Sequence, residues 1–196
     1  MRFIPLKLAD AFVVELEKMG DERGYFARSW CVREFAEHGL DPNLVQCNVS
    51  FNRHRGTLRG MHFQLPPFSE GKLVRCTRGR MLDVIVDIRP DAPTFLQWTG
   101  EELTPDNGRM MFVPKGFAHG FITLADDTEV FYQMTEFYDP GSARGVRWDD
   151  PLFGISWPEE PRVMSPKDQG YPPATREMFR PLHSSKLNPM GDPDGQ

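Results

Sequence analysis

The sequence predicts a mainly β protein, a double-sheet jelly roll with few short helices. Three observations favour that fold class: many short apolar segments with strand periodicity, frequent Gly and Pro between them, and scarcely any helical periodicity. A chain of 196 residues can bury a sizeable core as one domain without disulfides. We expect that domain over residues 1–180 and a disordered tail over 181–196, where no apolar period remains.

Seven segments have the apolar alternation or the short apolar run that is typical of strands. They are residues 45–51, 56–64, 72–77, 81–89, 110–113, 120–124 and 128–135. Segment 81–89 shows the alternation best, because the even-numbered residues from Leu82 to Ile88 fall on one face and Asp83 and Asp87 on the other.

One helix is predicted, from Trp30 to His38. Ser29 would be its N-cap and Gly39 its C-terminal stop. Its apolar face would consist of Val32, Phe35 and Ala36.

Two apolar, Gly-bounded segments, 59–64 and 114–121, carry one histidine each, and the spacing around them is that of a cupin. The second cupin signature, G-x5-P-x-G-x2-H, is met by Gly108, Pro114, Gly116 and His119. The sequence therefore predicts a cupin-type double-stranded β-helix, a fold whose interior usually holds a metal ion.

The first cupin signature is met only in part. Gly56 and His62 fit, but Gln64 replaces the second histidine and Lys72 stands where an acid is expected. An ammonium group cannot coordinate a divalent ion and repels it. We therefore expect a barrel without a metal, and no other cofactor.

Composition excludes several classes of function. A net charge of −5 argues against general nucleic-acid binding, and no apolar run approaches the ~18 residues that span a bilayer. The N-terminus lacks the features of a secretory signal. Three cysteines, an odd count, indicate reduced thiols in a cytoplasmic protein, where we expect them as small buried hydrophobes. They are Cys31, Cys47 and Cys76.

Several polar residues are candidates for a site inside the barrel. Arg59 lies three residues before His62 in an apolar strand, where its guanidinium needs an anionic partner such as a phosphate or diphosphate. Tyr132 shares the strand parity of Val130 and Met134, so its hydroxyl is expected to point inward.

Four side chains together have the chemistry needed to invert a carbon next to a carbonyl. His62 would be the base, Asp168 would orient it, Tyr132 would be the acid and Lys72 would stabilise an enolate oxygen. Three of them also have a structural interpretation: a buried tyrosine, an aspartate in a loop and a solvated lysine are common. The spacing alone does not identify the reaction.

From about Phe3 to Tyr171, the chain resembles the dTDP-4-dehydrorhamnose 3,5-epimerases, cupin-fold enzymes of dTDP-L-rhamnose and related deoxysugar synthesis. The segments that carry the resemblance are 21–26, 46–50, 56–64, 83–89, 114–121, 148–151 and 165–168. So many ordered segments make the resemblance far more specific than any single motif.

The resemblance implies a role for each matching residue. His62 matches the general base, Asp168 its dyad partner, Tyr132 the general acid, and Lys72 the residue near the C4 oxygen. Arg23 and Arg59 match contacts to the diphosphate, and Tyr138 matches the aromatic ring stacked on thymine. The other implied substrate contacts are Gln46, Asn48, His119 and Lys167.

The resemblance also implies a metal-free homodimer in which N-terminal strands cross to the partner. Arg23 would then serve the neighbouring subunit's site. The expected reaction converts dTDP-4-dehydro-6-deoxy-D-glucose to dTDP-4-dehydro-L-rhamnose.

Four positions depart from the family pattern. Arg28 and Ala143 stand where the family usually has Glu near the nucleotide, Cys47 replaces an Asp, and Phe63 replaces a Tyr. A 3- or 5-mono-epimerase acting on a CDP- or GDP-linked 4-keto sugar therefore remains an alternative. Two alternatives of other classes are a metal-dependent cupin and a non-catalytic sugar-binding jelly roll.

Overall fold

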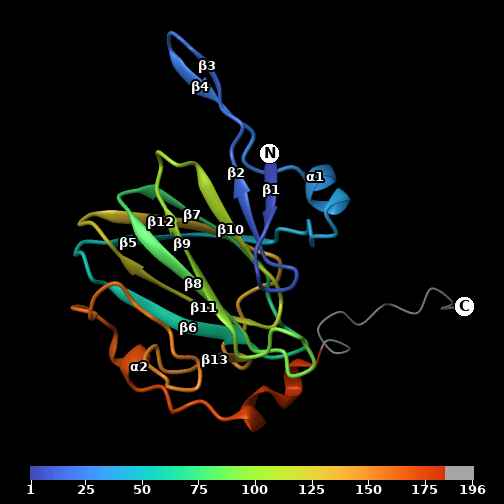
Figure 1. Cartoon of the computed structure of the whole chain (residues 1–196), viewed down its shortest axis with the longest axis vertical. Coiled ribbons are helices and arrows are strands. Elements are labelled where there is room, and N and C mark those ends of the chain that lie inside the picture. Colours follow the sequence, from blue (N-terminus) through green and yellow to red (C-terminus); the bar gives the residue numbers. More distant parts are fainter. Residues whose placement is uncertain (184–196) are drawn as a thin grey trace, which may run out of the picture.

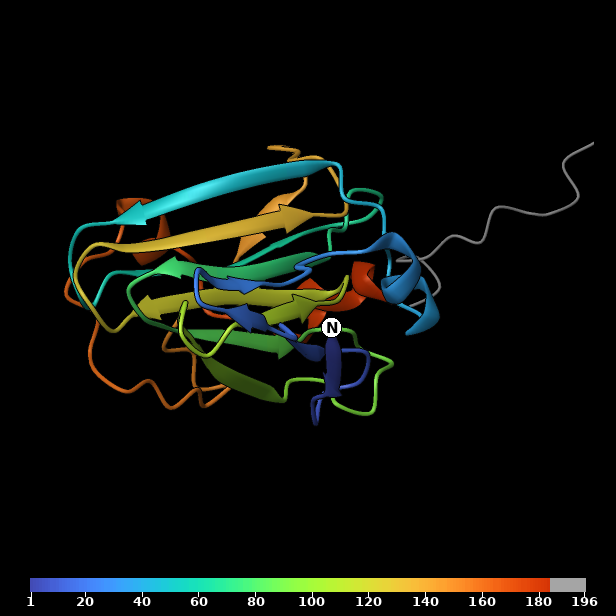
Figure 2. The same ribbon diagram turned by 90° about the horizontal axis from the view of Figure 1, so that it is seen from above.

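The computed structural model describes residues 1–183 and shows two packed β-sheets (Figure 1). The six-stranded sheet has the order β1 (Arg2–Pro5), β2 (Phe12–Glu15), β10 (Arg109–Val113), β7 (Lys72–Arg78), β12 (Thr128–Met134) and β5 (Gln46–Asn52). The five-stranded sheet has the order β13 (Ala143–Gly145), β6 (Leu58–Gln64), β11 (Phe117–Thr123), β8 (Met81–Asp87) and β9 (Trp98–Leu103). Figure 2 shows β5, β12 and β7 side by side. The predicted mainly β fold with few helices is confirmed.

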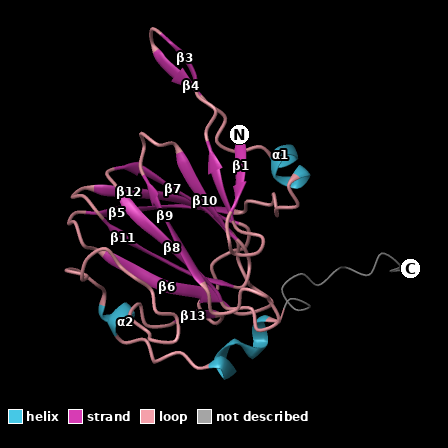
Figure 3. Ribbon diagram, in the orientation of Figure 1, coloured by secondary structure: helices cyan, strands magenta, loops and turns pink. Residues whose placement is uncertain are grey.

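The remaining elements lie outside the two sheets. Strands β3 (Met19–Asp21) and β4 (Gly24–Phe26) form a hairpin that extends away from the body (Figure 1). Helix α1 (Val32–Glu37) lies beside the N-terminal strands, and α2 (Pro166–Gln169) and the 3-10 helix η1 (Arg176–Leu182) lie near β6 and β13 (Figure 3). Leu182 is fully buried, so packed chain continues past residue 180. Of the predicted tail, residues 184–196 lie outside the described residues.

All seven predicted strands are present, with ends shifted by a few residues. The strand predicted over 120–124 begins earlier, at Phe117, and therefore includes His119. The strands that sequence patterns missed are β1, β2, β3, β4, β9 and β13, which are short or lack a clear alternation.

Strand β8 shows why this fold has two apolar layers. Ile85 packs into the cluster between the two sheets, whereas Val84 and Val86 pack outward against Phe179 and other residues of the C-terminal segment. The predicted alternation is confirmed. Both faces are buried, because the chain after β13 covers the outer face of this sheet.

Helix α1 is shorter than predicted and starts differently. Its N-cap is Cys31 instead of Ser29, without a side-chain cap, and Phe35 is its one fully buried residue. Val32 is 48% exposed, because a six-residue helix presents only one side chain to the N-terminal strands. Gly39 ends the helix as predicted, with a φ of 70° that favours glycine.

The three thiols have different environments, and none forms a disulfide. Cys76 is buried and Cys31 is half-buried, but Cys47 is exposed on the edge strand β5. The expectation of burial was therefore wrong for Cys47, because alternate residues of β5 face outward. Within residues 1–183, no helix has the length and apolar character needed to cross a bilayer.

Candidate active site

A cavity of about 590 Å³ lies between the two sheets. Its volume falls within the range of about 300–1,000 Å³ that small-molecule sites occupy. Both sheets contribute to its wall, together with Lys167 of α2 and Tyr171 after it. Nine of the predicted site residues line it: Gln46, Asn48, Arg59, His62, Lys72, His119, Tyr132, Tyr138 and Lys167.

His62 on β6 is paired with Asp168 on α2. The His62 Nε2 and the Asp168 Oδ1 lie 2.7 Å apart, and the side chains are 41% and 6% exposed. The sequence suggested that Asp168 lies in a loop, but it belongs to a four-residue helix. That helix forms here because Pro166 starts it and the Ser165 Oγ accepts the Asp168 N–H at 3.1 Å.

The electrostatics keep Asp168 ionised. Burial alone would raise its pKa, but the hydrogen bond and charge of His62, the Gly60 N–H and Ser165 together hold the pKa below its ordinary value. A carboxylate at this position accepts the Nε2–H of His62 and leaves the Nδ1 lone pair free for another proton. The pair has the arrangement of an oriented general base.

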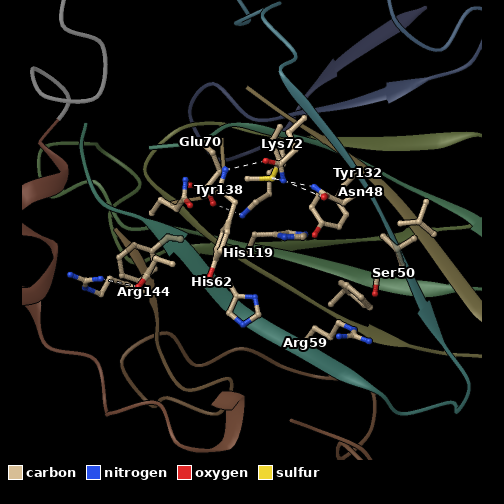
Figure 4. A pocket seen from close by; sticks show the side chains of 18 of the residues that line it. Asn48, Ser50, Arg59, His62, Glu70, Lys72, His119, Tyr132, Tyr138 and Arg144 are labelled. Carbon is tan, nitrogen blue, oxygen red and sulfur yellow. Dashed lines mark hydrogen bonds and ion pairs between the residues drawn. The ribbon is translucent and has the colours of Figure 1, made fainter. Parts of the chain in front are cut away.

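The opposite wall belongs to the six-stranded sheet. Tyr132 on β12 lines the cavity together with Val130 and Met134, as their shared parity predicted (Figure 4). Lys72 begins β7 and is not solvated, because its side chain is only 9% exposed and its Nζ lies 2.8 Å from the Glu70 Oε1. A phenol and an ammonium therefore face the cavity from the sheet opposite His62.

His119 on β11 stands directly opposite His62 in the strand register. Its Nε2 lies 2.7 Å from the Asp83 Oδ1, and its side chain is only 10% exposed. Glycines let these two strands approach closely, since a Cβ on Gly60 would come within 2.6 Å of the Gly120 Cα.

Polar side chains from β5 and β6 line the rest of the wall. The Gln46 amide donates to the Asn48 Oδ1 at 3.2 Å and accepts the Tyr138 N–H at 3.1 Å. The Arg59 Nε donates to the Asn52 Oδ1 at 2.8 Å. Among residues 1–183, Arg59 has no carboxylate partner, so the rest of its guanidinium is available to an anion.

Tyr171 and Glu70 are site residues that sequence reasoning missed. The Tyr171 ring lies where a Cβ of Gly145 would be, within 2.2 Å, and contacts the His62 ring edge-on at a centroid distance of 5.8 Å. Burial, together with the charges of Asp168 and Tyr138, raises the pKa of Tyr171 to about 12. Both residues lie outside the strands, where side-chain periodicity gives no signal.

Gln64 occupies the position of a cupin metal ligand, but its amide is fully used in holding loops. It donates to the carbonyls of Phe68 and Phe137 and accepts the Asp139 N–H, at 2.7, 3.1 and 2.7 Å. Within residues 1–183, no three His, Cys, Asp or Glu side chains are grouped to hold a metal ion. Metal independence stays a prediction from Gln64 and Lys72.

Arg23 is the predicted site residue that this chain does not bring to its own cavity. It lies at the turn of the exposed hairpin, where its guanidinium pairs with Asp21 and its side chain is 85% exposed. Arg28 pairs with Glu34 and also lies outside the cavity, whereas Ala143 lines it.

Comparison with known proteins gives one consistent result. The family model for dTDP-4-dehydrorhamnose 3,5-epimerase matches residues 5–175. A Sinorhizobium fredii dTDP-4-dehydrorhamnose 3,5-epimerase is 46% identical over 173 residues, which cover 88% of this chain and 89% of that protein.

Solved structures agree. A Bacillus anthracis dTDP-4-dehydrorhamnose 3,5-epimerase with TDP and PPi bound superimposes with a TM-score of 0.85 and 41% identity, covering 88% of this chain and 99% of that one. A Legionella pneumophila dTDP-6-deoxy-D-glucose-3,5-epimerase in complex with dTDP-4-keto-L-rhamnose superimposes with a TM-score of 0.82 and is 38% identical. The match covers 87% of this chain and 90% of that one. This chain belongs to the dTDP-4-dehydrorhamnose 3,5-epimerase family of isomerases.

Proposed function

We propose that the protein epimerises a nucleotide-linked 4-keto-6-deoxyhexose at C3 and C5, converting dTDP-4-dehydro-6-deoxy-D-glucose to dTDP-4-dehydro-L-rhamnose. The observation that carries this proposal is the placement of His62, paired with Asp168, across one cavity from Tyr132 and Lys72. The Legionella relative, whose structure holds dTDP-4-keto-L-rhamnose, supports the choice of substrate.

The C4 ketone of the substrate makes the adjacent C–H bonds acidic. His62 removes the proton from C3 or C5, and Asp168 stabilises the imidazolium that forms. Lys72 stabilises the enolate oxygen, and Tyr132 returns a proton to the other face of the ring. Exchange with solvent removes the proton from His62 and returns one to Tyr132, and a second round at the other carbon then completes the reaction. No cofactor is needed because the substrate already contains the carbonyl.

The cavity wall offers matching contacts for the rest of the substrate. The guanidinium of Arg59 suits the diphosphate, and Lys167 adds a second cation on the same cavity. Tyr138 is 52% exposed and can stack on the base. Gln46, Asn48 and His119 supply further polar contacts.

A homodimer would complete the site with Arg23. The hairpin exposes Met19, Tyr25 and Phe26 by 56–68%, and β5 exposes Val49 by 61%, so both surfaces have apolar area to bury. A hairpin that enters the neighbouring subunit's cavity would bring Arg23 to the diphosphate. The three free cysteines fit a reducing compartment, and we expect the protein in the cytoplasm.

Mixing two inactive variants tests the shared site. We expect Arg23→Ala and His62→Ala homodimers to be weakly active or inactive. Subunit exchange would create one site with both native residues and restore part of the activity. A monomer by light scattering would contradict the dimer, and a mixture that never regains activity would contradict the shared site.

Solvent exchange tests the reaction itself. The protein is incubated with dTDP-4-dehydro-6-deoxy-D-glucose in D₂O, and the sugar protons are followed by NMR. We expect deuterium at C3 and C5 and formation of the L-configured product, with lower rates for CDP and GDP analogues. Exchange at one carbon would identify a mono-epimerase, and no exchange would refute the epimerase proposal.

Retention of activity by chelator-treated protein with no bound metal would separate this enzyme from a metal-dependent cupin.

A further inference from the structure

Glu70 is a buried acid on the active-site cavity to which no role has been assigned. It lies two residues before Lys72, lines the cavity and is 7% exposed. Its Oε1 lies 2.8 Å from the Lys72 Nζ, and Figure 4 shows the two side chains together. Its Oε2 is also buried and, among the described residues, has no hydrogen-bond partner.

The ion pair of Glu70 and Lys72 lacks the hydrogen bonds that would make a buried pair stabilise the fold. A buried ion pair offsets the loss of water only when its remaining polar atoms are also hydrogen-bonded, and the Glu70 Oε2 is not. Replacing such a pair by well-packed hydrophobic residues of similar volume is often neutral or stabilising. A buried carboxylate kept at this cost needs another explanation, and its partner Lys72 faces the reaction.

The backbone between the two charges is held firmly. The Gly71 N–H donates to the Thr135 Oγ1 at 2.8 Å, and a Cβ on Gly71 would come within 3.2 Å of the Val113 carbonyl. Lys72 itself pairs with Val113 and Met134 in the six-stranded sheet. The start of β7 is therefore fixed, and only the flexible four-carbon stem of Lys72 remains to be positioned.

We propose that Glu70 is a positioning residue that holds the Lys72 ammonium in place to meet the enolate oxygen. The inference rests on the proposed role of Lys72 in epimerisation. A cation that is fixed before the reaction stabilises developing charge without reorganising, whereas a mobile one must be ordered during the step.

The first test is Glu70→Gln, which keeps the shape of the side chain and removes its charge. We expect kcat and the rate of deuterium exchange to fall about 10- to 100-fold with little change in KM, because the interaction is made in the transition state. The matched control is Asp41→Asn, which removes a carboxylate 3.1 Å from Lys115, a residue outside this cavity. We expect that variant to keep the wild-type kcat.

A double-mutant cycle distinguishes positioning from a separate structural role. If Glu70 acts through Lys72, the isosteric double variant Glu70→Gln/Lys72→Met will have the same kcat as Lys72→Met alone. The ¹⁵Nζ NMR signal of Lys72, protected in the wild type, will broaden in Glu70→Gln because the ammonium exchanges faster with water.

The outcomes separate this inference from the proposed function. Wild-type kcat in Glu70→Gln, or losses that multiply in the double variant, would overturn the role of Glu70 while leaving that of Lys72. Wild-type kcat in Lys72→Met would overturn both.

Discussion

Two histidine–aspartate pairs stand side by side in this protein and differ in what surrounds them. In each pair the histidine Nε2 lies 2.7 Å from an aspartate oxygen, and His62 and His119 are opposite each other on neighbouring strands. The His62 side chain is 41% exposed, whereas that of His119 is 10% exposed.

The two histidines differ in exposure because their aspartate partners come from different elements of the fold. Asp83 belongs to β8, the strand next to His119, so this pair lies within the sheet and Asp83 is fully buried. Asp168 comes from α2, beyond the edge of the sheet, and approaches His62 from outside. The same pair of groups can therefore form an accessible base at one position and part of the cavity wall at the other.

The largest expected effect is on catalysis by His62. We expect His62→Asn to lower kcat and C–H exchange by about 10³- to 10⁴-fold, the upper part of the range for a general base. For His119→Asn we expect an effect of about tenfold, mainly on KM, because His119 would contact the substrate without removing a proton. Steady-state kinetics and NMR exchange measure the effects of both substitutions. Equal losses in kcat would contradict the different roles of His62 and His119.

The loss of folding stability should be larger for substitution of His119 than for substitution of His62. His119→Leu leaves the fully buried Asp83 without its partner, and we expect a loss of about 3–5 kcal/mol in the free energy of unfolding. His62→Leu should cost less, about 1–2 kcal/mol, because Asp168 keeps the Gly60 and Ser165 contacts. Urea denaturation compares the two, and a larger loss for His62→Leu would contradict the contrast in burial.

Removing the orienting charge should have a smaller effect than removing the base. We expect Asp168→Asn to lower kcat about 100-fold, because the amide no longer fixes the tautomer of His62. A wild-type pH–rate profile and kcat in this variant would show that Asp168 does not orient the base.

The pH dependence of stability tests the same pair. The folded-state pKa of Asp168 lies below its ordinary value of 3.8, so its stabilising contribution is present above pH 3.8 and is lost as the pH falls through the lowered pKa. The stability difference between wild type and Asp168→Asn should therefore shrink as the pH falls below 3.8. A difference that stays constant in this acidic range would mean that the carboxylate is not held ionised by His62.

The smallest expected effect is on thiol reactivity. One cysteine is exposed and another is buried, as with the two histidines. Burial raises the pKa of Cys76 to about 11, and Cys47 is exposed. At pH 8 we expect a disulfide reagent to label Cys47 readily and Cys76 only after unfolding. Peptide mass spectrometry identifies the labelled residue, with Cys47→Ser as the control, and early labelling of Cys76 would contradict its burial.

The sequence predicted the positions that alternation controls. The parity of Tyr132 with Val130 and Met134 placed it on the cavity, and the cupin signatures singled out His62 and His119, which also line it. Alternation could not show that the face of β8 carrying Asp83 would also be buried, since that depends on the second sheet.

Local patterns could not predict the pairs between distant segments. The resemblance to the family implied that Asp168 partners His62 across 106 positions, but no local pattern shows it. Neither local pattern nor resemblance indicated that the Tyr171 ring fills the space over Gly145. Glu70 is near Lys72 in sequence, but a pair two residues apart has no fixed geometry outside regular structure.

By itself, the sequence determined seven of the strands, the family and the residue types that the reaction needs, because side-chain periodicity and motif spacing are local properties of the chain. The tertiary structure alone decided which histidine stays accessible and which carboxylates partner His119 and Lys72. These depend on strand register and on how the C-terminal segment packs against the sheet, and both are set only when distant parts of the chain meet.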